Sequence, residues 1–287
     1  MKLNLSIALA VISVVFIASY SPFTSKQTIV LQDIEWDSSS PATMHELTIP
    51  LGNSLAQGLI YTANGKGKHP TLLLLHGYPG NERNLDIAQV VRANGWNVIY
   101  FNYRGSWGSH GQFSLMNCVE DVITVVGYCK KYSDSLQIDT SNIALFGHSM
   151  GAWVCLKSLE RLPSVKKGFA LSTWNIYEEF KNVTDTQQLL STARRNAGEY
   201  FVLNTPLEKI FEPVFNNVNR FRLAANMSKL SDKMICMLDE HSGNKNLADT
   251  LKRYNSKNFK YDVWKTDHSF SNKRVSVMQH LLNLLNK

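Results

Sequence analysis

Hydrophobic and polar residues along this chain follow a pattern typical of strands that alternate with helices. Short apolar runs that end in turns predict strands, and apolar residues spaced three or four positions apart predict helices. The expected strands are residues 44–49, 55–62, 71–75, 96–101, 143–146, 168–172, 233–238 and 259–264. The expected helices are residues 84–94, 115–132, 149–162, 247–254 and 274–285. This alternation predicts an α/β protein with a mostly parallel sheet and helices on both of its faces.

The stretch between residues 174 and 230 breaks this alternation. It has no clear core strand, and it contains two segments with helical spacing, residues 186–195 and 206–215, together with many aromatic residues. An insertion of this kind usually covers the carboxyl ends of the strands, where ligands bind. We predict a helical cap or lid, and the alternative is a helical side layer with no gating role.

The first segment of the chain has the pattern of an export signal. Met1 and Lys2 are followed by an uncharged, mostly apolar run from Leu3 to Ser25. A basic start and a long apolar stretch are typical of a signal peptide, although no clean Ala-x-Ala cleavage site follows. If the run is retained, it is long enough to cross a bilayer.

We therefore predict that residues 1–25 are a signal peptide or a membrane anchor, with a buried helix as the remaining alternative. Residues 27–287 are then the folded domain. In both leading cases the domain is exported, either periplasmic or secreted, or tethered to the membrane by its N-terminal segment.

Composition narrows the range of partners. The 287 residues are 44% hydrophobic and 18% charged, which excludes wholesale disorder. The net charge is +7, but the basic residues are scattered, whereas a nucleic-acid interface gathers them, so we expect no nucleic-acid partner. The four cysteines lie in apolar segments and are predicted to be buried free thiols with no metal-binding spacing: Cys118, Cys129, Cys155 and Cys236.

The strongest chemical motif is Gly147-His-Ser-Met-Gly, which lies between a predicted strand and a predicted helix. A G-x-S-x-G sequence in this context is the signature of a nucleophile elbow, a sharp turn that presents a reactive serine. Small residues on either side let the strand and helix approach each other, and the helix N-terminus favours negative charge near the serine. We therefore predict that Ser149 is a catalytic nucleophile.

A second motif, His76-Gly-Tyr-Pro-Gly, directly follows the buried strand at residues 71–75. A glycine-rich turn at this place can direct a backbone N–H toward the serine. We predict an oxyanion hole formed by the N–H groups of Tyr78 and Met150, with a plain strand-ending turn as the alternative.

A serine nucleophile needs a base, and the base needs an acid that orients it. His268, in the Asp267-His-Ser-Phe segment after the last strand, is the predicted base. The acid should follow the preceding strand, and Asp239 is our first choice, with Glu240 as the alternative and Asp249, Asp262 or an acid elsewhere as weaker ones. The chain order Ser149, Asp239, His268 is the order nucleophile, acid, base, which differs from that of trypsin-like and subtilisin-like enzymes.

These motifs resemble those of the α/β-hydrolases, and the resemblance extends from about residue 44 to residue 287. Besides the serine, histidine and glycine-rich motifs, the Asn102-Tyr-Arg-Gly-Ser turn is similar to one in prolyl-oligopeptidase-like and acylaminoacyl-peptidase-like members. The resemblance implies an eight-stranded, mostly parallel sheet, a Ser–His–acid triad and no cofactor. The helical insertion expected from the break in alternation then follows strand 6. In this turn we interpret Arg104 as structural, with a substrate clamp as the alternative.

These observations predict a serine hydrolase that cleaves a carboxylic ester, or a related acyl bond, of a small-molecule or peptide substrate through an acyl-enzyme. The first alternative is an exported peptidase of the prolyl-oligopeptidase-like type. A catalytically silent binding protein with the same fold is a weaker alternative, because it would not need both Ser149 and His268. The sequence leaves the acyl chain length and the oligomeric state open.

Overall fold

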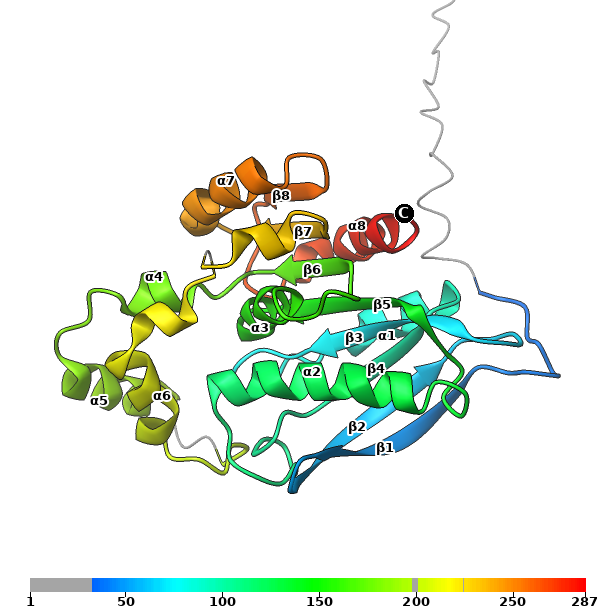
Figure 1. Ribbon diagram of the computed structural model, residues 1–287, viewed down its shortest axis with the longest axis horizontal. Helices are drawn as coiled ribbons and strands as arrows, with labels where there is room; N and C mark the ends of the chain where they lie inside the picture. Colours follow the sequence, from blue (N-terminus) through cyan, green and yellow to red (C-terminus); the bar gives the residue numbers. More distant parts are fainter. Residues whose placement is uncertain (1–32, 198–200, 224) are drawn as a thin grey trace, which may run out of the picture.

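The computed structural model describes residues 33–197, 201–223 and 225–287 (Figure 1). The predicted signal peptide or anchor, residues 1–25, lies outside the described residues. Within the described ranges, no helix is both long enough and apolar enough to cross a membrane.

The described residues form one eight-stranded sheet with the strand order β1-β2-β4-β3-β5-β6-β7-β8. The strands are β1 (Thr43–Leu51), β2 (Ser54–Thr62), β3 (His69–Leu75), β4 (Asn97–Phe101), β5 (Ile138–His148), β6 (Lys167–Leu171), β7 (Met234–Asp239) and β8 (Phe259–Val263). β1 and β2 pair antiparallel, β2 also pairs antiparallel with β4, and all other pairs are parallel. The predicted mostly parallel sheet is confirmed, and β5 begins five residues before the predicted strand.

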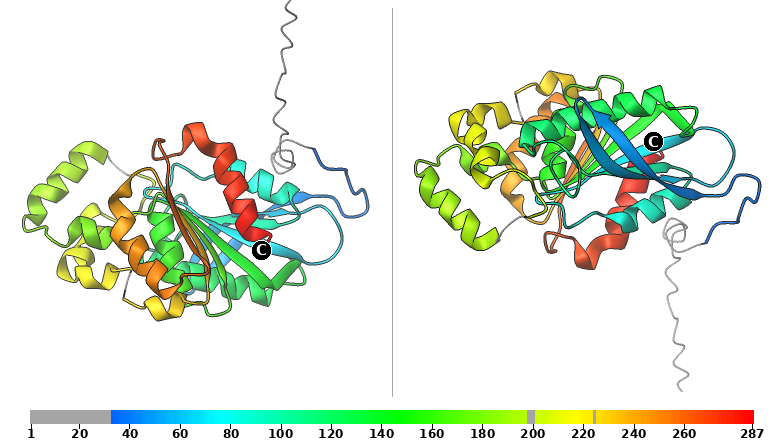
Figure 2. Two further views of the ribbon diagram at one scale, coloured as in Figure 1. Left: turned by 90° about the horizontal axis from the view of Figure 1, so that it is seen from above. Right: turned by 90° about the horizontal axis from the view of Figure 1, so that it is seen from below.

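Helices cover both faces of this sheet (Figures 1 and 2). The α-helices are α1 (Leu85–Ala93), α2 (Leu115–Lys131), α3 (Met150–Leu159), α4 (Ile176–Phe180), α5 (Thr186–Ala197), α6 (Leu207–Asn216), α7 (Lys245–Tyr254) and α8 (Arg274–Leu285). The 3-10 helices are η2 (Val218–Phe221), η3 (Met227–Leu230), η4 (Ser242–Asn244) and η5 (Ser271–Lys273).

Two hydrophobic clusters hold these layers together. One lies between the sheet and α2, α3 and α7, and the other lies between the sheet and α1 and α8. The central strands β3 and β4 contribute apolar side chains to both clusters, which explains their continuous apolar runs. All four cysteines are buried and free, as predicted.

Residues 174–230, which we call the cap segment, lie between β6 and β7 and contain α4, α5, α6, η2 and η3. The two predicted helices in this segment are confirmed as α5 and α6, whereas the five-residue α4 was too short to predict from periodicity. The cap segment projects beyond the carboxyl ends of the parallel strands, at the left of Figure 1.

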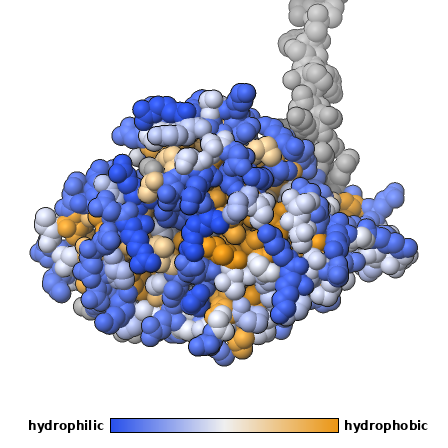
Figure 3. Space-filling view, viewed as in Figure 1, coloured by the Kyte–Doolittle hydropathy of each residue, from blue (hydrophilic) through white to orange (hydrophobic). Residues whose placement is uncertain are grey.

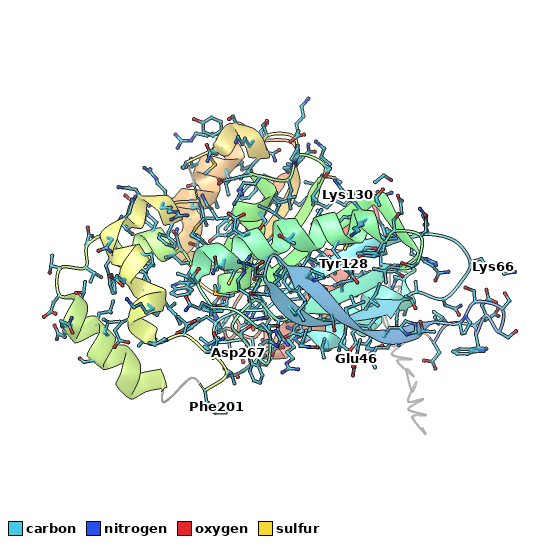
Figure 4. The ribbon with its side chains drawn as sticks, turned by 60° about the horizontal axis from the view of Figure 1, so that its bottom comes forward. Glu46, Lys66, Tyr128, Lys130, Phe201 and Asp267 are labelled. Atoms are coloured by element: carbon cyan, nitrogen blue, oxygen red, sulfur yellow. The ribbon has the colours of Figure 1, made fainter. Side chains whose placement is uncertain are left out.

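The outer surface is mostly polar. On the face shown in Figure 3, hydrophilic side chains predominate, and apolar ones gather in small patches near its middle. Phe201 of the cap segment projects into solvent, where it is 92% exposed (Figure 4).

Candidate active site

Ser149 occupies the sharp turn between β5 and α3. Its backbone angles, φ 58° and ψ −119°, fall in a region that residues with side chains rarely adopt, and such strain is typical of functional sites. A Cβ atom on Gly147 would collide with the Gly151 carbonyl, and one on Gly151 would collide with the carbonyl of Leu75. Both positions therefore require glycine, because strand, turn and helix backbones meet there.

The glycine-rich turn after β3 passes directly beside this serine. A Cβ atom on Gly77 would lie 3.2 Å from Ser149 Cβ and 3.7 Å from its Oγ. Tyr78, the next residue, lines the same cavity as Ser149. Met150 is the first residue of α3, so its N–H has no acceptor within the helix. The structure thus brings Tyr78 and Met150 next to Ser149.

His268 lies on the loop after β8, beside Asp267, which is labelled in Figure 4. Its Nδ1 atom is 2.8 Å from Oε1 of Glu240. Burial raises the pKa of Glu240, but hydrogen bonds from His268 and Ser172 outweigh this effect and lower the pKa to about 2. The same hydrogen bond to Glu240 raises the pKa of His268, although partial burial opposes the shift. The two groups therefore stabilise each other in their charged forms.

The structure does not place Asp239 against His268, which corrects our first choice of orienting acid. The Asp239 carboxylate is fully buried, accepts a hydrogen bond of 2.9 Å from the Thr173 N–H and accepts one of 3.1 Å from Asn244 Nδ2. It therefore links the ends of β6 and β7. Glu240, the alternative, is one residue further along, where the strand ends and the side chain turns toward the histidine loop.

Ser172, which the sequence analysis did not single out, joins this group. Its hydroxyl donates a hydrogen bond of 2.6 Å to Glu240 Oε2 and lies 2.8 Å from His268 Nδ1. The residue follows β6 with a φ of 53°, a conformation that favours glycine. Ser172 belongs to no recognised sequence motif. Its position at the carboxyl end of a buried strand was the one feature of the sequence that could have suggested a place near the site.

His148, the residue before Ser149, also contacts the histidine loop. Its Nε2 lies 2.8 Å from the backbone carbonyl oxygen of His268, and the two rings are 4.9 Å apart between centroids. Because a carbonyl only accepts, His148 Nε2 carries the proton. The side chain is buried, and this burial lowers its pKa, so the neutral form is favoured.

Ser149, His268 and Glu240 share a cavity of about 530 Å³ at the carboxyl ends of the strands. Its wall combines residues of the sheet loops and the cap segment: Tyr78, Ser149, Ser172, Thr173, Trp174, Asn175, Glu178, Glu179, Glu240, His241, Gly243, Asn244 and His268. Tyr78 and Trp174 supply its aromatic walls. Glu178 and Glu179 supply carboxylates from the cap segment, and no Lys or Arg is among the described residues of the wall.

Four aromatic rings of the cap segment contact one another: Trp174, Phe180, Phe211 and Phe215. Phe180 and Phe211 are buried, with ring centroids 5.7 Å apart, and Phe211 also contacts the Tyr78 ring at 5.9 Å. Of the cap segment's rings, Trp174 is the one that forms part of the described cavity wall. The cap segment is therefore packed onto the turn that carries Tyr78.

Arg104 binds a buried carboxylate and does not line the cavity. Its Nε donates a hydrogen bond of 2.6 Å to Asp121 Oδ1, and its backbone N–H donates one of 2.9 Å to Asp121 Oδ2. This pairing ties the loop after β4 to α2, which supports the structural interpretation of Arg104. Among the residues with described positions, no group of three or more His, Cys, Asp or Glu side chains is arranged to hold a metal ion.

Comparison with known proteins shows several relatives. Residues 75–170 match a family described as a protein of unknown function, DUF1749. The lysophosphatidylserine lipase of Danio rerio is 27% identical over 105 residues, a match that covers 36% of this chain and 26% of the lipase. The chain spans less than half the length of the first curated relatives that it matches.

Two archaeal structures show the same architecture. The Pyrococcus furiosus esterase has a TM-score of 0.58 and 19% identity, with 88% of this chain and 97% of the esterase covered. The Pyrococcus horikoshii acylaminoacyl peptidase has a TM-score of 0.64 and 12% identity, with 85% of this chain and 41% of the peptidase covered. Together with the sheet order and the strand–turn–helix around Ser149, these similarities identify the chain as a protein of the α/β-hydrolase fold.

Proposed function

We propose that this protein is a serine hydrolase that cleaves a carboxylic ester of a small molecule through an acyl-enzyme. The observation that carries the proposal is one cavity lined by three groups. Ser149 lies on the strained turn between strand and helix, and His268 is hydrogen-bonded to the Glu240 carboxylate. These three groups come from loops that follow different strands, as the active sites of this fold do. If Ser149 only formed a turn and His268 only filled space, the two residues and Glu240 would not need to line the same cavity.

In the proposed mechanism Ser149 Oγ attacks the ester carbonyl carbon and His268 accepts its proton. The Glu240 carboxylate accepts the hydrogen bond from His268 Nδ1–H, which leaves the Nε2 lone pair as the base. Once the imidazole is protonated, Glu240 stabilises the positive charge. His268 then gives the proton to the leaving alkoxide, and a water molecule repeats both steps on the acyl-enzyme.

The proposed oxyanion hole consists of the N–H groups of Tyr78 and Met150. The turn with Tyr78 passes beside Ser149, and Met150 N–H is at the positive end of α3. Donors of this kind are worth about 2.7–4 kcal/mol each in the transition state.

The cavity wall favours a small neutral or cationic substrate with an apolar part. Tyr78 and Trp174 provide apolar contact, whereas the carboxylates of Glu178 and Glu179 would repel an anionic group. This charge pattern argues against a phosphate-bearing substrate of the class named for the Danio rerio lipase. A peptide substrate is the second candidate, because the loop at residues 102–106 resembles that of peptidases and a solved peptidase shares the fold.

We also propose that the domain is exported or membrane-anchored, because residues 1–25 have the pattern of a signal peptide or anchor. Expression of the full chain, followed by cell fractionation and N-terminal sequencing, tests this proposal. Recovery of the protein in the cytoplasm with residues 1–25 intact would contradict it.

The experiment that tests the enzymatic function is labelling with a fluorophosphonate, a probe that reacts with activated serines. We expect the wild-type protein to be labelled at Ser149, and the folded variants Ser149→Ala and His268→Ala to remain unlabelled. A panel of neutral, cationic and anionic p-nitrophenyl esters, beside aminoacyl p-nitroanilides, then separates esterase from peptidase. Folded wild-type protein that is neither labelled nor active on the panel would contradict the proposal.

A further inference from the structure

Trp107, in the loop between β4 and α2, contacts both the glycine-rich turn and the cap segment. Its indole Nε1–H donates a hydrogen bond of 2.9 Å to the Pro79 carbonyl oxygen. Its backbone N–H donates one of 2.8 Å to the carbonyl oxygen of Val202 in the cap segment. The residue has a φ of 48°, which is rare for a bulky side chain and is retained here by contacts on both sides.

The turn is shaped to receive this indole. A Cβ atom on Gly80 would lie 2.6 Å from Trp107 Nε1 and 2.7 Å from His76 Nδ1, so only glycine leaves room for the ring. The guanidinium carbon of Arg83 lies over the Trp107 ring, 4.6 Å from its centroid. The last glycine of the His76-Gly-Tyr-Pro-Gly motif is therefore explained by Trp107, and its role depends on a residue 27 positions away.

The same loop holds the cap segment at several further points. Ser106 and Leu203 form an antiparallel bridge, and the Asn204 N–H donates a hydrogen bond of 2.9 Å to the Gly105 carbonyl. The Asn204 side-chain amide also donates to the Gly111 carbonyl. From the other side, the Tyr78 ring contacts Trp174 and Phe211 of the cap segment.

We propose that Trp107 is a positioning residue that holds the turn carrying Tyr78 and ties it to the cap segment. The Pro79 carbonyl belongs to the Pro79–Gly80 peptide group, and the Tyr78–Pro79 peptide group separates it from the one that carries the Tyr78 N–H. The indole hydrogen bond anchors the turn just after Tyr78, and the contacts of the Tyr78 ring with Trp174 and Phe211 hold Tyr78 itself against the cap segment. The cap segment and the proposed oxyanion hole then behave as one rigid unit. This inference rests on the proposed hydrolase function.

The test is the variant Trp107→Phe, which keeps an aromatic ring beside Arg83 and removes the indole N–H. We expect kcat for the best p-nitrophenyl ester to fall about 10- to 100-fold with KM changed less than about threefold, because a displaced donor weakens the transition state more than the bound substrate. Trp96→Phe is the control for the same Trp-to-Phe change, since Trp96 is a buried tryptophan next to α1 and β4, whereas Trp107 is partly buried. We expect its kcat to stay within about twofold of wild type.

Activities are expressed per Ser149 labelled to completion by fluorophosphonate, so that loss of folded protein does not count as loss of kcat. A Trp107→Phe variant with wild-type kcat would overturn the inference while leaving the hydrolase function intact. Wild-type protein that neither reacts with the probe nor hydrolyses esters would instead remove the proposed function itself.

A second variant, Asn204→Ala, tests the tie to the cap segment. It removes the side-chain bond to Gly111 but leaves Trp107 in place. If the cap segment and the turn form one unit, kcat falls in Asn204→Ala, and the double variant with Trp107→Phe loses less than the product of the two single losses. Losses that simply multiply, or an Asn204→Ala variant with unchanged kcat, would overturn the coupling.

Discussion

Replacement of Glu240 by Gln tests which carboxylate orients the histidine. Gln retains the size and one hydrogen-bond acceptor of Glu240, but it removes the negative charge 2.8 Å from His268 Nδ1. In the proposed mechanism His268 must be neutral to accept the Ser149 proton, so activity is expected to fall as the pH drops through the pKa of His268. Because Glu240 raises that pKa, its removal should extend activity to lower pH while lowering the maximal rate.

The size of the effect follows from the pKa of Glu240, which is about 2 and not the ordinary 4.5. This difference corresponds to about 3.4 kcal/mol at 1.36 kcal/mol per pH unit. Ser172 supplies part of it, and the His268 side chain is 56% exposed, so solvent screens the charge pair. We take about half, or roughly 1.7 kcal/mol, as the share that comes from the charged His268, so the removal of Glu240 lowers the pKa of His268.

The assay is the pH dependence of kcat/KM and kcat for Glu240→Gln, with Asp239→Asn as the matched comparison. In Glu240→Gln we expect the acidic limb to move to lower pH, because the pKa of His268 is no longer raised by the carboxylate. The kcat of Glu240→Gln should fall at least about 10-fold, as expected from roughly 1.7 kcal/mol. The upper limit is about 10⁴-fold, which is the loss seen when the acid of a Ser–His–Asp triad is neutralised. Asp239→Asn should lower the melting temperature without moving the limb. The reverse result, a shifted limb in Asp239→Asn alone, would refute the assignment of Glu240.

Three further predictions concern the surroundings of the site. Ser172→Ala removes the hydroxyl bonded to Glu240 and should lower kcat about 10-fold without loss of fold, as measured by ester hydrolysis and circular dichroism; unchanged kcat would contradict this role. His148→Phe leaves the His268 carbonyl without its donor, so kcat should fall, and His148→Gln should restore part of it; equal kcat in both variants would contradict the reasoning. Gly151→Ala forces a methyl group against the Leu75 carbonyl and should destabilise the protein by about 3 kcal/mol or more in urea denaturation, whereas a loss below about 1 kcal/mol would show that the elbow can relax.

The strands and long helices could be predicted from the sequence because their signals are local. The sheet is covered on both faces, so its central strands are continuous apolar runs. Their short length and the turn residues beside them separate these runs from the longer, periodic helices. The glycines around Ser149 were equally visible, because the elbow leaves no space for side chains at those two positions. The short helix α4 was missed because five residues carry too little periodicity to stand out.

Which carboxylate contacts His268 could not be predicted in this way. Asp239 and Glu240 are adjacent, and successive residues at a strand end point in different directions, so only the path of the chain decides which carboxylate meets His268. In the structure Asp239 turns inward to Thr173 and Asn244, and Glu240 turns to the histidine loop. The contribution of Ser172 depends in the same way on contacts between β6, β7 and the loop after β8.

The sequence by itself determined the fold class and the positions of Ser149 and His268, because these depend on local periodicity and on motifs in which neighbouring residues share one turn. Only the tertiary structure decided which acid faces the histidine, which residues brace it and why Gly80 must be glycine. These features depend on side chains that come together from distant parts of the chain, such as Trp107 with Pro79 and His148 with His268. The order of the strands and the paths of the loops bring these residues into contact, and no short stretch of sequence specifies either one.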